Sequence, residues 1–145
     1  MLEVLFSSGL RKSELMRLQL LDIGADRGVL FVRQGKGRKD RVVPVGDRAL
    51  HWLDHYMQNG RPEHCPDPDP GNVFLSRLGR RLSATMVHVR CRHWVERGGW
   101  RRQARHPHAW RHASATALLD GGAGLRHVQA FLGHEHVRTT VLYTE

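Results

Sequence analysis

The sequence predicts a mainly helical α+β domain that contains one small antiparallel β-hairpin. Apolar residues recur at helical spacing in several segments, and glycines or prolines mark where those segments begin or end. Two stretches rich in β-branched residues flank a single glycine-bearing turn, as in a hairpin. The chain has 145 residues, which suits one domain with a modest core. We therefore expect a single domain over residues 1–145.

The chain begins with two predicted helices. Residues 1–6 read as the end of a helix that stops at Gly9, because glycine is suited to a C-terminal cap. Residues 11–20 are the second helix, with Arg11 in its first turn. Its apolar stripe consists of Leu10, Leu15 and Leu18.

The hairpin follows, with strands at residues 28–33 and 41–45. Pro44 lacks a backbone donor, so the second strand either lies at an edge of the sheet or ends there. Residues 47–57 have apolar positions at helical spacing and are predicted as a helix. Residues 59–72 contain four prolines, which cannot continue a helix. We expect this segment to be an exposed connector inside the domain, because neither flank is long enough to fold alone.

A longer helix is predicted after the connector. Ser83 is suited to be its N-cap, and the helical pattern continues to about residue 95. The opposite face continues a basic tract that begins at Arg77. The expected inner face consists of Val87, Cys91, Trp94 and Val95.

Three helices are predicted at the end of the chain. Pro107 suits the first position of a helix that runs to about residue 120 and ends at two glycines. Residues 125–132 form a short helix closed by Gly133. Residues 137–143 are predicted to be helical, although valine and threonine have poor helix propensity.

The charge of the chain favours a polyanionic partner. Lys and Arg number 23 against 14 Asp and Glu, which gives a net charge of +9 and a pI near 10.9. Nucleic acid is the most plausible polyanion for so basic a domain. An anionic membrane is the rival partner, but no apolar run approaches the roughly 18–20 residues of a spanning helix. The first residues also lack the charged region of a secretory signal, so we expect a soluble, cytoplasmic protein.

The two cysteines suit a reducing compartment. Cys65 and Cys91 belong to no C-x-x-C pair and to no framework of several cysteines. We expect both to be bystanders rather than metal ligands.

The last forty residues and two upstream motifs carry the residues of a phosphate-directed site. A phosphodiester whose phosphorus becomes five-coordinate needs cationic donors on its non-bridging oxygens, and a guanidinium stays charged at any working pH. Arg11 and Arg111 are the candidates for this role. His108 lies three residues before Arg111, which places both on one helix face.

The remaining candidates would move protons or attack phosphorus. Lys36 lies between two glycines at the hairpin turn, where its ammonium could protonate a leaving oxygen. His134 follows the glycine-stopped helix and could donate to a phosphate oxygen. Tyr143 is a phenol with an ordinary pKa near 10, so it needs a base or nearby cations before it can act as a nucleophile.

Other basic residues suit contact with a DNA backbone, since phosphate contacts supply sequence-independent affinity. They lie at the hairpin turn, in the tract before the 83–95 helix and on that helix. The candidates are Arg38, Lys39, Arg41, Arg80, Arg81 and Arg90.

Taken together, these motifs resemble the tyrosine recombinase family, also called phage integrases, and look closest to its Xer-type members. They extend over nearly the whole chain in the order that the family has. The matching motifs are Gly9-Leu10-Arg11 with Ser13-Glu14-Leu15, Gly35-Lys36-Gly37, Pro107-His108 with Arg111-His112, Leu132-Gly133-His134, and Thr139-Thr140 leading to Tyr143.

The resemblance implies the catalytic-domain fold of that family and a role for each matched residue. Arg11 and Arg111 would clamp the scissile phosphate, and His134 would support it. Lys36 would protonate the 5′ oxygen while His108 exchanges the proton of Tyr143, which forms a 3′-phosphotyrosyl bond. Glu14 matches a supporting acidic position.

The resemblance also implies the partners of the chain. The reaction needs neither metal nor nucleotide cofactor, acts on double-stranded DNA and is carried out in this family by a homotetramer on DNA. The chain departs from the pattern in two ways. Trp110 replaces a smaller aliphatic residue, and both the N-terminal core-binding domain and the C-terminal tail are expected to be missing.

Three alternatives remain open on the sequence alone. The chain could be an integrase remnant that binds DNA without recombining it. Type IB topoisomerases share the chemistry but match the short hairpin and Leu132-Gly133-His134 less well. A histidine-rich metal binder is disfavoured because arginines crowd the site. Its ligands would be His106, His108, His112, His134 and His136.

Overall fold

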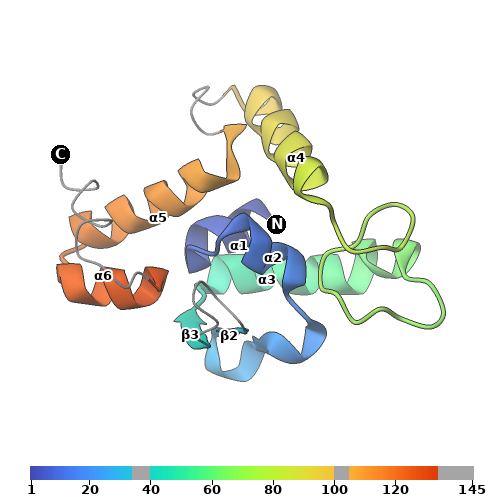
Figure 1. The fold of residues 1–145 in the computed structure, drawn as a ribbon, viewed down its shortest axis with the longest axis horizontal. Helices are drawn as coiled ribbons and strands as arrows, with labels where there is room; N and C mark the ends of the chain where they lie inside the picture. Colours follow the sequence, from blue (N-terminus) through green and yellow to red (C-terminus); the bar gives the residue numbers. More distant parts are fainter. Residues whose placement is uncertain (34–39, 100–104, 134–145) are drawn as a thin grey trace.

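The computed structural model describes residues 1–33, 40–99 and 105–133. In that part of the chain, helices α1 and α2 lie over α3, while α5 and α6 pack together at one side and α4 lies across the top (Figure 1). Helix α1 contacts both α3 and α5, and α2 contacts α4. The helices are α1 (Leu2–Ser8), α2 (Lys12–Arg17), α3 (Asp47–His55), α4 (Ala84–Arg97), α5 (Pro107–Asp120) and α6 (Leu125–Leu132).

The predicted hairpin is present and belongs to a three-stranded antiparallel sheet of order β1-β2-β3. The strands are β1 (Ile23–Gly24), β2 (Val29–Val32) and β3 (Arg41–Pro44). Strand β3 is at an edge and ends at Pro44, as the missing donor of that proline requires. The two-residue strand β1 was not predicted, because it is too short to show an alternating pattern. The expected α+β class, mainly helical with a small antiparallel sheet, is confirmed.

The predicted helix ends are confirmed at positions where one residue type favours a helix start or a helix stop. Gly9 and Gly133 cap α1 and α6 with φ values of 59° and 63°, a region that disfavours residues with a Cβ. The Ser83 hydroxyl accepts a hydrogen bond of 3.2 Å from the backbone N–H of Met86 at the start of α4. Pro107 is the first residue of α5.

The second helix is shorter than predicted, because α2 ends at Arg17 rather than at residue 20. The backbones of Leu18 and Leu20 are bonded to the connector, through Val73 N–H to the Leu18 carbonyl and Leu20 N–H to the Gly71 carbonyl, both at 2.9 Å. The predicted apolar stripe is still buried. These long-range bonds replace the helical ones, so tertiary pairing overrides the helical pattern.

The inner face of α4 also differs from the prediction at one position. Val87, Cys91 and Val95 are fully buried, but Trp94 is 52% exposed. The three buried residues are each four apart and form a narrow seam, whereas the Trp94 ring lies beside His93 and within 6.0 Å of the Arg97 guanidinium. Trp94 is therefore a surface residue.

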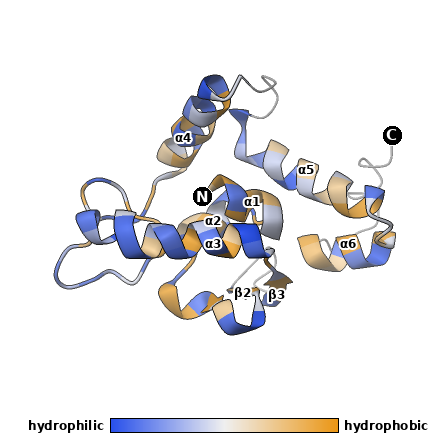
Figure 2. Ribbon diagram, turned by 180° about the vertical axis from the view of Figure 1, so that it is seen from behind, coloured by the Kyte–Doolittle hydropathy of each residue, from blue (hydrophilic) through white to orange (hydrophobic). Residues whose placement is uncertain are grey.

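The main core joins α1 and α2 to the sheet and to α3, α4 and α5, and it includes Trp110, which is 8% exposed. Trp110 is thus a core residue, although it replaces a smaller aliphatic residue of the motif. A smaller cluster of Ala115, Val128 and Leu132 joins α5 to α6. Apolar stretches of the central helices lie inside the molecule, while the loop beyond α3 is mostly polar (Figure 2). No helix among the described residues is both long and apolar enough to cross a bilayer.

Candidate functional site

Three of the predicted site residues line one pocket. Arg11 at the start of α2 and His108 and Arg111 in the first two turns of α5 surround a cavity of about 410 Å³. Its other lining residues are Leu10, Lys12, Ser13, His88, His106 and Pro107. Two segments a hundred residues apart therefore bring their cationic and imidazole groups together.

Arg111 is the most deeply placed of these groups, with 1% of its surface exposed. Its Nη1 donates to the carbonyl of Gly9, and its Nη2 donates to the carbonyl of Leu132. Both carbonyls are at helix ends, where they lack intrahelical partners. The guanidinium thus joins the ends of α1 and α6 to α5, and its orientation is fixed by the fold.

Arg11 approaches the same helix end from α2. Its Nη2 donates to the Gly133 carbonyl at 3.3 Å, next in sequence to the carbonyl that Arg111 binds. Its Nη1 and its backbone N–H donate to the carboxylate of Glu14 at 3.0 and 2.7 Å. The two guanidinium groups therefore converge at the end of α6, which is the arrangement that a clamp for one phosphate requires.

Glu14 is buried between two arginines. Arg41 donates to both of its carboxylate oxygens, at 2.8 and 3.0 Å. Burial by itself raises the pKa of Glu14, but the hydrogen bonds and charges of Arg41 and Arg11 outweigh it and hold that pKa below its ordinary value. Glu14 is therefore ionised at neutral pH.

Arg41, which the sequence predicts as a DNA-backbone contact, is bonded within the chain. Its side chain is 13% exposed, and its Nε donates to the Phe131 carbonyl at 3.2 Å in addition to the bonds with Glu14. The buried carboxylate attracts the guanidinium inward, since an unpaired buried charge is costly. Sequence reasoning missed this role, and no local signal distinguishes Arg41 from the other basic residues near the turn.

His108 is an exposed residue at the pocket rim. Its pKa is lowered by partial burial and by the nearby charges of Arg111, His112 and Arg11. The imidazole is therefore mainly neutral at pH 7, so it is able to accept a proton. His106, also at this pocket, has its ring 4.9 Å from that of His88.

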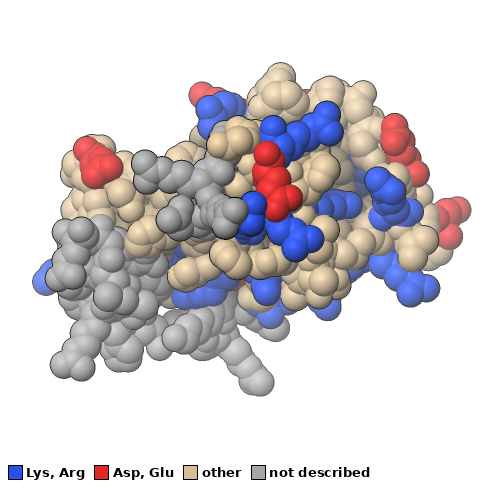
Figure 3. All heavy atoms as spheres, turned by 90° about the horizontal axis from the view of Figure 1, so that it is seen from above, with Lys and Arg blue, Asp and Glu red and all other residues tan. Residues whose placement is uncertain are grey.

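The remaining candidates are divided between the surface and the segments outside the described residues. Lys36, Arg38, Lys39, His134 and Tyr143 lie outside the described part of the chain. Arg80 and Arg81 are exposed in the loop before α4, and Arg90 is half-buried with its Nη2 3.5 Å from the Leu75 carbonyl. Groups of basic side chains with a few acidic ones between them occupy the face in Figure 3.

A metal site finds no support in the described ranges. Within residues 1–33, 40–99 and 105–133, no three His, Cys, Asp or Glu side chains are grouped so that they could hold an ion. His134 and His136 of the metal-binding alternative are outside those ranges. Cys65 and Cys91 are free thiols.

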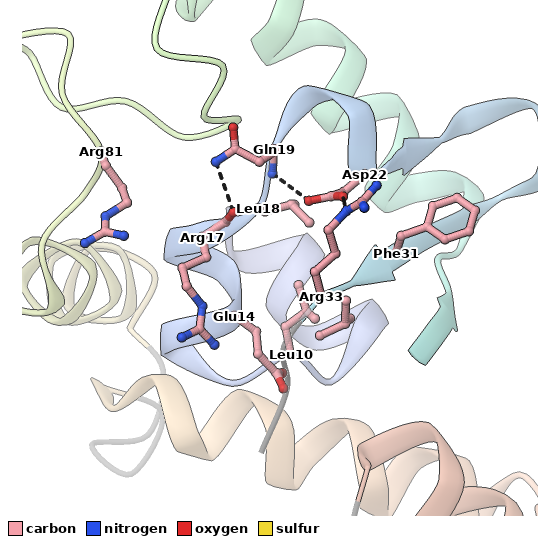
Figure 4. A pocket seen from close by; sticks show the side chains of 10 residues that line it. Leu10, Glu14, Arg17, Leu18, Gln19, Asp22, Phe31, Arg33 and Arg81 are labelled. Atoms are coloured by element: carbon pink, nitrogen blue, oxygen red, sulfur yellow. Dashed lines mark hydrogen bonds and ion pairs between the residues drawn. The ribbon is translucent and has the colours of Figure 1, made fainter. Parts of the chain in front are cut away.

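A second pocket of about 330 Å³ lies between α2, the end of β2 and Arg81 (Figure 4). Asp22, one of the two acids that line it, accepts hydrogen bonds from the Arg33 Nε at 2.5 Å and from the backbone N–H of Gln19 at 3.0 Å. The carboxylate is therefore paired within the chain. The sequence did not predict this pocket, because its walls come from three separate stretches of the chain.

Comparison with known proteins places the whole chain in one group. Residues 1–145 match the Phage integrase family. The chain is 44% identical to the tyrosine recombinase XerD of Proteus mirabilis over 144 residues, which are 99% of this chain and 46% of that protein. It is 43% identical to the tyrosine recombinase XerC 2 of Ralstonia nicotianae, over 99% of this chain and 41% of that one. The chain thus spans about half the length of these relatives.

Solved structures agree with the sequence relatives. The crystal structure of XerA recombinase superimposes with a TM-score of 0.89 at 31% identity, covering 99% of this chain and 51% of that one. XerH recombinase bound to a palindromic difH substrate, in a post-cleavage complex, gives a TM-score of 0.83 at 25% identity over 99% and 40% of the two chains.

Proposed function

Because this chain belongs to the phage integrase family of tyrosine recombinases, we propose that residues 1–145 are the catalytic domain of a site-specific DNA recombinase. Its reaction is the cutting and rejoining of double-stranded DNA through a 3′-phosphotyrosyl intermediate. XerH, which is similar to this chain, has been captured in a post-cleavage complex with its DNA substrate. A protein acting on chromosomal or mobile DNA would work in the cytoplasm.

The observation that carries the proposal is the convergence of Arg11 and Arg111 on one helix end. Their guanidinium groups donate to the adjacent carbonyls of Leu132 and Gly133 and line the same pocket as His108. Fixed cationic donors stabilise the charge that develops on the non-bridging oxygens as phosphorus becomes five-coordinate, and they need no reorganisation to do so. A scissile phosphate at this pocket would be clamped from two sides.

The chemical steps follow from the residue types. His108 takes the phenolic proton as the Tyr143 oxygen attacks phosphorus, and the bond from phosphorus to the 5′ oxygen breaks. Lys36 gives a proton to that leaving oxygen, while His134 donates to a non-bridging oxygen. The phosphotyrosyl ester conserves the energy of the original bond, so attack by a 5′ hydroxyl of a second strand reverses the step without a nucleotide cofactor.

Affinity for DNA comes from basic side chains outside the pocket. Arg80, Arg81 and Arg90 lie in one tract before and on α4, and Arg38 and Lys39 are at the hairpin turn in the sequence. Each phosphate contact releases counterions, so binding should weaken steeply with salt. Recombination between two DNA duplexes requires several protomers, and we expect a homotetramer to form on DNA.

Covalent trapping tests this function. The purified chain is incubated with a pool of nicked duplexes of random sequence, in which cleavage near the nick releases a short strand that diffuses away. A protein–DNA species that survives denaturant is expected with the wild type and is expected to be lost with Tyr143→Phe. If both proteins bind the pool equally and neither forms the covalent species, the chain is a DNA-binding remnant and the recombinase proposal is wrong.

A further inference from the structure

We propose that Arg41 is a positioning residue for the reaction. Its positive charge compensates the negative charge of the ionised Glu14, which leaves the charge of Arg11 available to the scissile phosphate. The inference rests on the proposed recombinase function. It replaces the sequence-based expectation that Arg41 contacts the DNA backbone.

The contacts of Glu14 show how the charge is distributed. Its Oε1 accepts from Nη1 of both Arg11 and Arg41, and its Oε2 accepts from the Arg11 backbone N–H and from Nη2 of Arg41. Arg41 engages both oxygens in the bidentate geometry that is strongest for a guanidinium and a carboxylate. The charges of Arg41 and the Glu14 carboxylate cancel, so Arg11 retains a net positive charge toward the pocket.

Without Arg41 the balance would change. Arg11 would remain as a guanidinium partner of Glu14, and the full negative charge of the carboxylate would act on the Arg11 side chain 3.0 Å away. Glu14 is 1% exposed in its side chain, so water would screen this attraction poorly. Arg11 would then be drawn toward the carboxylate and away from an anion in the pocket.

Arg41 also fixes the end of α6, where both clamp arginines bind. Its Nε donates to the Phe131 carbonyl. A Cβ placed on Gly133 would come within 3.0 to 3.2 Å of Cδ, Nε and Cζ of Arg41, so the side chain packs directly on that residue. The guanidinium of Arg41 is therefore bonded to Glu14, which holds Arg11. It is also bonded to the end of α6, which accepts hydrogen bonds from both Arg11 and Arg111.

Lysine would not reproduce this arrangement. An ammonium keeps the charge but has no planar pair of donors for both carboxylate oxygens and no Nε for the Phe131 carbonyl. Arg41→Lys keeps the charge and loses only the geometry, whereas Arg41→Gln loses both, so the loss should be milder for Arg41→Lys.

The experiment measures the rate of covalent adduct formation in a single turnover at saturating nicked DNA, together with the dissociation constant for the same duplex. We expect Arg41→Gln to lower the rate about 100-fold and Arg41→Lys about 10-fold, the range expected when a reacting group is misplaced by about 1 Å. The dissociation constant should change less than about 3-fold, since the Arg41 side chain is only 13% exposed. Thermal melting first shows whether each variant folds. If Arg41→Gln does not fold, Arg41→Lys still tests the proposal.

Arg48→Gln is the matched control. Arg48 also joins two elements through a carboxylate, from α3 to Glu3 of α1 at 2.9 Å, but its side chain is 71% exposed and lies outside the pocket. We expect it to leave the rate within about 2-fold of wild type, because exposed pairs contribute little.

A neutral substrate separates positioning from a general structural defect. A methylphosphonate diester lacks one charged non-bridging oxygen and so depends less on the Arg11 charge. The loss caused by Arg41→Gln should shrink at least 5-fold on this substrate, which a merely loosened fold would not produce. An unchanged loss on methylphosphonate would refute the charge mechanism, and a loss confined to DNA affinity would restore Arg41 to the DNA backbone.

Amide hydrogen exchange makes the outcome independent of turnover. In Arg41→Gln, but not in Arg48→Gln, the amide of Arg11 that donates to Glu14 and the last amides of α6 should exchange faster. If the wild type forms no adduct, the proposed function fails while this comparison still decides whether Arg41 positions Arg11. Unchanged exchange at those amides would refute the positioning role.

Discussion

Substitution of Gly133 by alanine should destabilise the chain more than the same change at Gly99. Both residues have a left-handed backbone, with φ of 63° and 66°, so both substitutions incur the backbone cost of about 1–2 kcal/mol that an L-residue has there. A Cβ on Gly99 would meet no atom within 4 Å, whereas one on Gly133 would meet Cδ, Nε and Cζ of Arg41 at 3.0 to 3.2 Å. Gly99→Ala is therefore the matched control for backbone strain alone.

The additional cost at Gly133 follows from what holds Arg41 in place. Moving its guanidinium by a few tenths of an ångström lengthens its bonds to Glu14 and Phe131. A hydrogen bond to a charged group contributes about 1.5–3 kcal/mol, so the loss of one such bond makes Gly133→Ala roughly 1.5–3 kcal/mol more costly than Gly99→Ala. Urea unfolding followed by circular dichroism measures both free energies.

A double-mutant cycle identifies the source of that difference. In an Arg41→Ala background the contact is absent, and the cost of Gly133→Ala should fall to that of Gly99→Ala. Equal costs at the two glycines in the wild-type background, or an undiminished cost at Gly133 without Arg41, would refute the packing described for this helix end.

The other predictions concern the core and the titrating groups. Trp110→Ala should cost about 3–5 kcal/mol in urea unfolding because the ring is 8% exposed, whereas Trp94→Ala, at a 52% exposed position, should cost less than about 1 kcal/mol. The pKa of Glu14 is lowered, so its ionised form contributes its full stabilisation above the ordinary pKa of 4.5. This stabilisation is lost as the pH falls through the folded-state pKa of Glu14. Glu14→Gln should therefore flatten the acid side of a plot of unfolding free energy against pH. The pKa of His108 is lower in the folded chain than in the unfolded chain, so as the pH falls the unfolded chain binds the proton at a higher pH. The free energy of unfolding should therefore decline as the pH falls below 6.5 and level off below the folded-state pKa. His108→Gln should remove that decline in unfolding curves, and an NMR titration should show the pKa of His108 rising when DNA places a phosphate beside it. A His108 pKa at or above 6.5 in the free protein would contradict the electrostatic description of the pocket.

The sequence alone determined the features that depend on one residue and its nearest neighbours. Gly9 and Gly133 end helices because their backbone angles disfavour a side chain, and Ser83 begins one because its hydroxyl accepts an early N–H. The strands on either side of the turn were evident from β-branched residues. The motifs also predicted that Arg11 and Arg111 act on one phosphate, and both residues line one pocket.

The tertiary structure decided the features that depend on distant contacts. Helix α2 ends early because its last predicted residues bond to the connector, and Trp94 is exposed because the buried seam of α4 is only one residue wide in each turn. Arg41 could be placed beside Glu14 only once β3, α2 and α6 had been brought together. A guanidinium binds whichever carboxylate or carbonyl the fold presents, and the Arg11 bond to Gly133 spans 122 residues, so no local pattern encodes these partners.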